Sequence, residues 1–171
     1  ISKQSEKTYK KYKKDKDFKN HPCFGFIQLY YMNNPMIYIT TPPMKCLFGV
    51  QKTGNQFQMS LQFTDYDEDN IMKSFYEWIQ EFEFSCMKLL GLGVEDGDLY
   101  ISQIKYDKNG KYDPNLSVKL PFSYNRFDTD IYTENSNTMN LLSIPNFTMV
   151  QCDIYMDKLW KMNEKFYSKW K

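Results

Sequence analysis

The run from residue 37 to 63 constrains the fold most, because its second half alternates strictly between apolar and polar side chains. The apolar positions are Phe57, Met59, Leu61 and Phe63. Side chains two residues apart share one side of an extended chain, so this spacing predicts a β-strand with one buried face. Gly54 tolerates the positive φ of a tight turn, which predicts a hairpin with a strand at residues 45–51.

The rest of the chain predicts more strands around a single helix. Between residues 69 and 90, apolar side chains recur every three or four positions, which is typical of an amphipathic helix lying across the open sheet face. Asp67 or Asp69 is expected to cap its start, Gly91 and Gly93 to end it, and Glu83 to lie on its outer face. Further strands are predicted at residues 24–32, 36–40, 99–106, 116–122, 127–133 and 147–161, with a last one ending near residue 170.

These elements together predict a mainly β fold with one central helix, in the α+β class. Small antiparallel sheets usually close into a barrel that removes their edges, and a five-stranded barrel with one inserted helix is the oligonucleotide-binding (OB) architecture. We therefore expect an antiparallel OB-fold-like barrel. Residues 1–20 are expected to form a basic flexible N-terminal arm, and residues 21–171 a single OB-like domain.

Catalytic and metal-binding patterns find little support. Cys23, Cys46, Cys86 and Cys152 lie far apart, and the only histidine is His21. Neither a zinc pattern, a glycine-rich phosphate loop nor a nucleophile motif is present. An Mg²⁺-dependent nuclease built on residues 65–69 is a third hypothesis, although helix capping explains these carboxylates too. We expect no enzyme, no catalytic residues, no cofactor and no metal. Sparse cysteines and the lack of a membrane-length apolar run predict a cytosolic protein without a membrane partner.

Binding to single-stranded nucleic acid is better supported, because it needs cations for the phosphates and flat side chains on which bases stack. The formal net charge is only +1, so local charge clusters matter more than the total. The arm is dense in lysine, which suits phosphate tracking, although a solvated terminus explains it equally well. The candidate residues are Lys10, Lys11, Lys13, Lys14, Lys45, Phe48, Lys105, Tyr106, Lys119, Tyr124, Arg126, Lys158, Trp160, Lys169 and Trp170.

Two segments carry a family resemblance: TPPMKCLFGV with its following hairpin and helix, and MDKLWKMNEKFYSKWK near the end. They resemble the single-stranded-DNA-binding proteins of nucleocytoplasmic large DNA viruses, of the kind found in African swine fever virus. The resemblance implies an OB-fold core that coats unpaired strands during viral DNA replication or repair, in the host cytoplasm or the virion. Tyr167 departs from the family pattern, which often has glycine there.

Two functions are therefore weighed against each other. The first is sequence-tolerant binding of single-stranded DNA, with RNA left open as a ligand. The alternative is a structural or protein-interaction module of a viral replication complex or virion, in which the same aromatic side chains form core and interfaces. Replication proteins and further copies of the chain are the protein partners expected.

Overall fold

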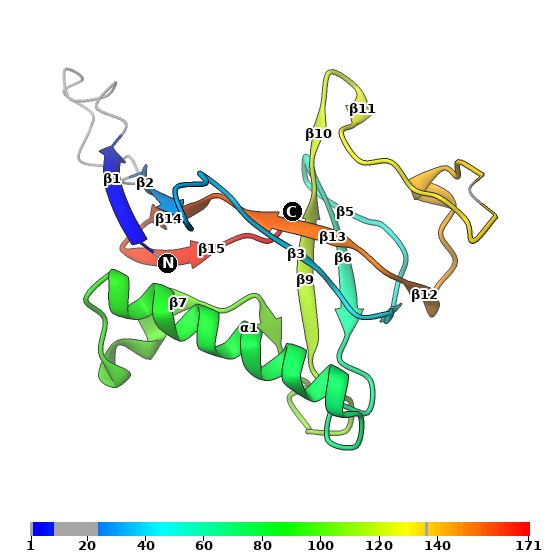
Figure 1. Cartoon of the computed structure of the whole chain (residues 1–171), viewed down its shortest axis with the longest axis horizontal. Coiled ribbons are helices and arrows are strands. Elements are labelled where there is room, and N and C mark those ends of the chain that lie inside the picture. Colours follow the sequence, from blue (N-terminus) through cyan, green and yellow to red (C-terminus); the bar gives the residue numbers. More distant parts are fainter. Residues whose placement is uncertain (1, 9–23, 136) are drawn as a thin grey trace. The chain divides into compact units, whose positions relative to one another are not determined.

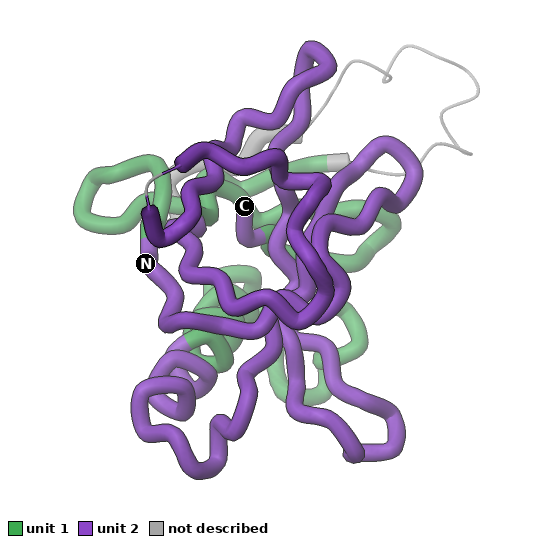
Figure 2. Tube along the Cα trace, turned by 90° about the vertical axis from the view of Figure 1, so that its right-hand side faces the viewer, with its two compact units in different colours: residues 1–38, 79–102, 155–169 green, residues 39–78, 103–154, 170–171 purple. Residues whose placement is uncertain are grey.

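The computed structural model describes residues 2–8, 24–135 and 137–171. The chain divides into two compact units, each assembled from separate segments (Figure 2). Unit 1 comprises residues 1–38, 79–102 and 155–169, and unit 2 comprises residues 39–78, 103–154 and 170–171. Helix α1 (Asn70–Leu89) contributes its first half to unit 2 and its second half to unit 1.

The main sheet of unit 1 has the strand order β1-β2-β14-β15-β7 (Figure 1). Its strands are β1 (Ser2–Thr8), β2 (Phe24–Tyr30), β14 (Lys158–Met162), β15 (Lys165–Ser168) and β7 (Tyr100–Ile101). All neighbours pair antiparallel except β15 and β7, which pair parallel. A 3-10 helix, η3 (Val94–Leu99), precedes β7.

The core of unit 1 includes a buried chain of polar contacts that links the helix to two strands. The hydroxyl groups of Tyr100 and Ser168 form a hydrogen bond of 2.7 Å. The Tyr100 side chain also forms a hydrogen bond with the Cys86 thiol on α1. Ile27 and Leu159 are buried on the same side of the sheet as Ser168. Apolar burial and satisfied polar groups therefore fix one face of this sheet.

The main sheet of unit 2 has the order β12-β4-β6-β9-β8, with β5 also pairing with β6. Its strands are β4 (Met44–Cys46), β5 (Gln51–Thr53), β6 (Gln56–Gln62), β8 (Ile104–Lys105), β9 (Asn115–Leu120) and β12 (Thr148–Val150). The hairpin of β10 (Phe122–Ser123) with β11 (Arg126–Phe127) forms a separate pair in unit 2. Another separate pair is β3 (Ile37–Thr40) with β13 (Asp153–Met156), and the boundary between the units falls within both of these strands. A 3-10 helix, η4 (Leu141–Ser143), lies before β12.

The predicted alternation in residues 57–63 is confirmed. Phe57, Met59, Leu61 and Phe63 are all buried. Their neighbours on β9 are the buried Leu116, Val118 and Leu120. The Phe63 ring lies 5.0 Å from the Tyr76 ring on α1, so the first half of the helix covers this apolar face. Gly54 has φ +59° in the turn between β5 and β6, as the hairpin requires.

The helix begins and ends as its sequence predicts. The Asp69 carboxylate accepts hydrogen bonds from the Ile71 and Met72 N–H groups at 2.8 and 3.0 Å, and Gly91 follows the helix at φ +73°. Glu83 differs from its predicted outer position, since it is only 7% exposed. The Ser102 hydroxyl donates to its carboxylate at 2.5 Å. Residues of unit 1 therefore bury a position of the helix that lies outside its predicted apolar stripe.

Several predicted long strands are broken into shorter ones. Residues 99–106 supply β7 to unit 1 and β8 to unit 2, and residues 147–161 are divided among β12, β13 and β14. The 45–51 strand is interrupted at Gly49, where φ is +60° and an added Cβ would lie 2.6 Å from the Ile144 carbonyl oxygen. Only glycine fits this bend without displacing the backbone.

The predicted mainly β class with one α-helix is confirmed. Within the described ranges, however, the strands form several sheets and none closes into a barrel, so the predicted closure is not observed. The same breaks in the long strands explain this, because each short strand pairs within its own sheet. In the part of the chain that the structure describes, no helix is both long and apolar enough to cross a membrane.

The start of the predicted arm contains a strand. Residues 2–8 form β1, which pairs antiparallel with β2. This pairing covers an edge of β2 whose backbone groups would otherwise be open. The arm candidates Lys10, Lys11, Lys13 and Lys14 lie outside the described residues.

Candidate nucleic-acid interface

Three rings line up across the sheet of unit 1. Phe26 on β2 pairs with Trp160 on β14, which pairs in turn with Tyr167 on β15. Directly paired residues project to the same side of a sheet, so these rings share one face. The Phe26 and Trp160 ring centroids are 5.4 Å apart, and all three side chains are half-buried. We call Phe26, Trp160 and Tyr167 the aromatic row.

The aromatic row lies on the face opposite the core of unit 1. Ile27, Leu159 and Ser168 are the next residues along the three strands and are all buried. Successive side chains of a strand alternate between the two faces, so the rings project away from that core. The register continues from Tyr167 to Ile101 on β7, which is 37% exposed. The face therefore offers an apolar and partly accessible band.

Lysines lie over the rings of the aromatic row. The Lys158 ammonium is 4.9 Å from the Phe26 ring centroid and 5.9 Å from that of Trp160. The Lys169 ammonium is 5.4 Å from the Tyr167 ring centroid. Such cations are attracted to the ring faces. Burial raises the pKa of the Tyr167 hydroxyl above its usual value.

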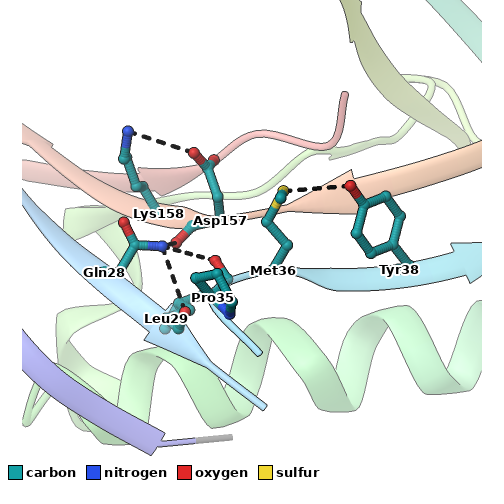
Figure 3. A network of polar contacts seen from close by, with 7 residues as sticks. All are labelled: Gln28, Leu29, Pro35, Met36, Tyr38, Asp157 and Lys158. Carbon is teal, nitrogen blue, oxygen red and sulfur yellow. Dashed lines mark hydrogen bonds and ion pairs between the residues drawn. The ribbon is translucent and has the colours of Figure 1, made fainter. Parts of the chain in front are cut away.

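A polar network holds Lys158 in place beside the row (Figure 3). Gln28, the residue paired with Lys158, donates from its side-chain amide to the Pro35 carbonyl at 2.7 Å and the Asp157 carbonyl at 2.8 Å. The Lys158 ammonium also lies 3.4 Å from the Asp157 carboxylate. The network therefore fixes the backbone around this lysine, and the carboxylate offsets part of its charge.

Unit 2 presents a second, more polar surface on the outer side of its sheet. The register aligns five residues across five strands in the order Met149, Lys45, Gln62, Asn115 and Lys105. On β9, Lys119 shares this side and pairs with Gln58. We call Lys45, Gln58, Gln62, Lys105, Asn115 and Lys119 the polar sheet face.

The polar sheet face carries charge of one sign. The six strands of this sheet contain Lys45, Lys52, Lys105 and Lys119 and no acidic residue. Neither Lys45 nor Lys119 forms an ion pair with any residue that the structure describes. The carboxylates of the described residues lie on the helix, loops and other strands, so this sheet carries only positive charge. Such a surface attracts phosphates within a Debye length of roughly 8 Å.

Three further candidates of unit 2 are exposed aromatic residues. Phe48 is exposed in the loop after β4, and Tyr106 is exposed just after β8. The Tyr106 hydroxyl is 2.9 Å from that of Tyr76, which orients the ring. Tyr124 is 96% exposed at the tip of the β10–β11 hairpin, together with the exposed Arg126.

Trp170 does not fit its predicted role in base stacking. Its side chain is fully buried, with its ring 6.1 Å from that of Trp78 on α1. Its backbone bridges Val118 and accepts a hydrogen bond from the Lys119 N–H at 2.8 Å. Since the ring fills the core of unit 2, it offers no face to a base.

Sequence reasoning missed Phe26 and Tyr167, two of the three rings in the aromatic row. The alternation of the β2 sequence places Phe26 and Gln28 on one face, and that signal was readable. The pairing of β2 with β14 joins segments far apart in the chain, and no local pattern indicates it.

The acidic stretch at residues 65–69 acts in turns and capping. The Asp65 N–H donates to the Asp113 carboxylate at 2.9 Å, and Asp69 caps α1. Within the described ranges, no three His, Cys, Asp or Glu side chains are grouped so that they could hold a metal ion.

Comparison with protein-family models, curated proteins and solved structures finds no match to this chain.

Proposed function

We propose that this protein binds single-stranded DNA without sequence preference. The observation that carries the proposal is the aromatic row, in which three rings from three hydrogen-bonded strands share one accessible face with Lys158 and Lys169 over them. Base stacking on such rings contributes about 1–3 kcal/mol per base and tolerates any sequence, because every base has a flat face.

The orientation of the rings favours an unpaired strand over a duplex. The Phe26 and Trp160 ring centroids are 5.4 Å apart, and the ring planes are tilted by 52° to each other. Bases that stack on both rings must therefore leave the parallel stack of a duplex. An unpaired strand reorients its bases easily, while a duplex would have to unstack both of its strands.

The polar sheet face supports the same function in a different way. Lys45, Lys105 and Lys119 carry the charge that phosphates need, and the neighbouring amide side chains donate hydrogen bonds. Binding through such contacts weakens with salt, with a slope of log affinity against log salt of about −0.7 per phosphate contacted.

The proposal extends to the finer assignments made from the sequence. The resembling segment at residues 156–171 contains Trp160 and Tyr167, and Tyr167 adds a ring where the viral family often has glycine. We therefore propose that the fold is an OB-like arrangement whose barrel is left open. We also propose that the protein coats unpaired strands in viral replication or repair, in the host cytoplasm. An open sheet can still bind, because stacking needs a row of rings rather than a closed barrel.

Titration of a fluorescent oligo-dT, followed by anisotropy over a salt series, tests the proposal. The strand should have about 20 nucleotides, more than the roughly 4–16 nucleotides covered by an OB fold. We expect tight binding at low salt and much weaker binding to a duplex of the same length. Equal affinity for the duplex, or no binding at low salt, would refute the function.

One observation favours the alternative role as a protein-interaction module. The segment from residue 139 to 149 exposes four apolar side chains, at Met139, Leu142, Phe147 and Met149. Exposed apolar groups of this kind often mark protein interfaces. If this role is the correct one, Phe147→Asp will abolish a saturable protein complex, and the wild-type chain will retain no oligonucleotide.

A further inference from the structure

The β10–β11 hairpin is a short projection of unit 2. It continues from β9 in Figure 1, and its strands pair only with each other in the described structure. Phe122 and Phe127 face each other across it and anchor its base on the buried Phe57, with ring centroids 4.8–5.0 Å apart. The Asp128 N–H also donates to the Pro121 carbonyl at 3.0 Å.

The tip of this hairpin holds a tyrosine in an unfavourable conformation. Tyr124 and Asn125 form the two-residue turn with φ +49° and +60°. Asparagine and glycine suit such a turn, whereas a bulky side chain in the left-handed region is strained. The Tyr124 ring is 96% exposed and has no ring, cation or hydrogen-bond partner among the described residues. Neither turn geometry nor packing explains a tyrosine here, and strain retained without a structural reason points to function.

Both faces of the Tyr124 ring are open, unlike those of the aromatic row, whose rings rest on a sheet. A ring open on both faces can lie between two bases, whereas a ring on a sheet can stack with only one. Arg126 is exposed two residues away, pairs with Ser123 across the hairpin and forms no ion pair within the described ranges. The nearest carboxylate on the hairpin, Asp128, is engaged by the Ser123 hydroxyl at 2.8 Å.

We infer that Tyr124 inserts its ring between two successive bases of a bound single strand, while Arg126 binds the adjoining phosphate. This inference rests on the proposed function and adds to it a specific contact on unit 2. The ligand is an unpaired strand, because its bases separate to admit a ring without the unstacking of two paired strands and the kink that a duplex would need. Arginine suits the phosphate, since its planar guanidinium can bind two oxygens at once.

Photocrosslinking tests the contact directly. An oligo-dT carrying 5-iododeoxyuridine is irradiated with the full-length protein, and the tryptic peptides are sequenced by mass spectrometry. Cleavage after Lys119 and Arg126 isolates residues 120–126 as one peptide. We expect a crosslink at Tyr124 within this peptide. Crosslinks at the aromatic row alone would overturn the inference and leave the proposed function standing, whereas a protein that retains no strand would overturn both.

A variant separates the ring from the turn. Tyr124→Asn keeps a residue that accepts the left-handed turn, so we expect the melting temperature to be unchanged or raised. The affinity for oligo-dT should fall by at least about 5- to 150-fold, the loss expected for a single stacked base, because this ring stacks with two bases, while Tyr124→Phe should bind as the wild type does. Tyr132→Asn is the matched control, since this side chain is 62% exposed elsewhere in unit 2. The inference would be overturned if Tyr124→Asn bound oligo-dT as tightly as the wild type under conditions in which Trp160→Ala binds it weakly.

Discussion

Replacing Trp160 with alanine tests the aromatic row at its centre, because this ring lies between Phe26 and Tyr167 in the register. Its removal deletes the stacking surface for one base and the ring beneath the Lys158 ammonium. One lost stack corresponds to about 1–3 kcal/mol, or about a 5- to 150-fold weaker affinity. No phosphate contact is removed, so the slope of log affinity against log salt should stay the same.

The variant must be compared as a folded protein. Full burial makes a Trp→Ala change cost about 3–5 kcal/mol, and this ring is half-buried, so we expect roughly half that loss of stability. Anisotropy titrations with oligo-dT should therefore be run well below the melting temperature, with circular dichroism as the check on folding. Trp160→Phe is the matched control, since it keeps a flat ring, and it should retain most of the affinity. A folded Trp160→Ala protein that binds as the wild type does would refute the reasoning.

Three further predictions concern charge and burial. Replacing both Lys45 and Lys119 with glutamine should reduce the magnitude of the salt slope by about 1.4, or about 0.7 for each phosphate contact, without removing the preference for single strands. Asp157→Asn should strengthen binding and steepen the salt slope, because its carboxylate lies 3.4 Å from a lysine ammonium over the aromatic row. Burial raises the pKa of the Cys86 thiol from 9.0 to about 12, so the unfolded chain should ionise first and stability should fall as the pH rises between these values.

Each of these predictions has a control or a contradicting outcome. The double lysine variant is compared with Lys108→Gln, at a lysine in the turn after β8. If the two variants have the same slope of log affinity against log salt, the prediction that the polar sheet face contacts phosphates is wrong. Weaker binding by Asp157→Asn would show that this carboxylate positions the lysine rather than offsetting its charge. For Cys86, urea unfolding at a series of alkaline pH values is compared with Cys86→Ser, and an unchanged pH dependence in the variant would contradict the assigned cause.

The local elements were predictable because their causes lie within a few residues. The alternation at residues 57–63, the turn at Gly54 and the cap at Asp69 each depend on neighbouring side chains, and the structure confirms them. The single helix amid strands followed from the change of period between residues 69 and 90. These signals suffice for the fold class.

The arrangement of the strands depends on contacts that no local pattern records. Residues 99–106 read as one strand but divide between two units, and Glu83 looks solvent-facing on a helical projection yet is buried beside Ser102. Trp170 follows a lysine in the sequence, which predicted a stacking residue, but its ring fills the core of unit 2. The aromatic row arises from pairing between β2 and β14, which only the folded structure brings together.

An abasic oligonucleotide provides the most direct test of the central claim, that rings on this protein stack on bases. It keeps the phosphates and removes the flat partners, so charge and stacking are separated in the ligand. We predict that the wild-type protein binds oligo-dT much more tightly than an abasic strand of equal length, and that Trp160→Ala narrows this difference. Equal affinity of the wild-type protein for the two strands would contradict the account.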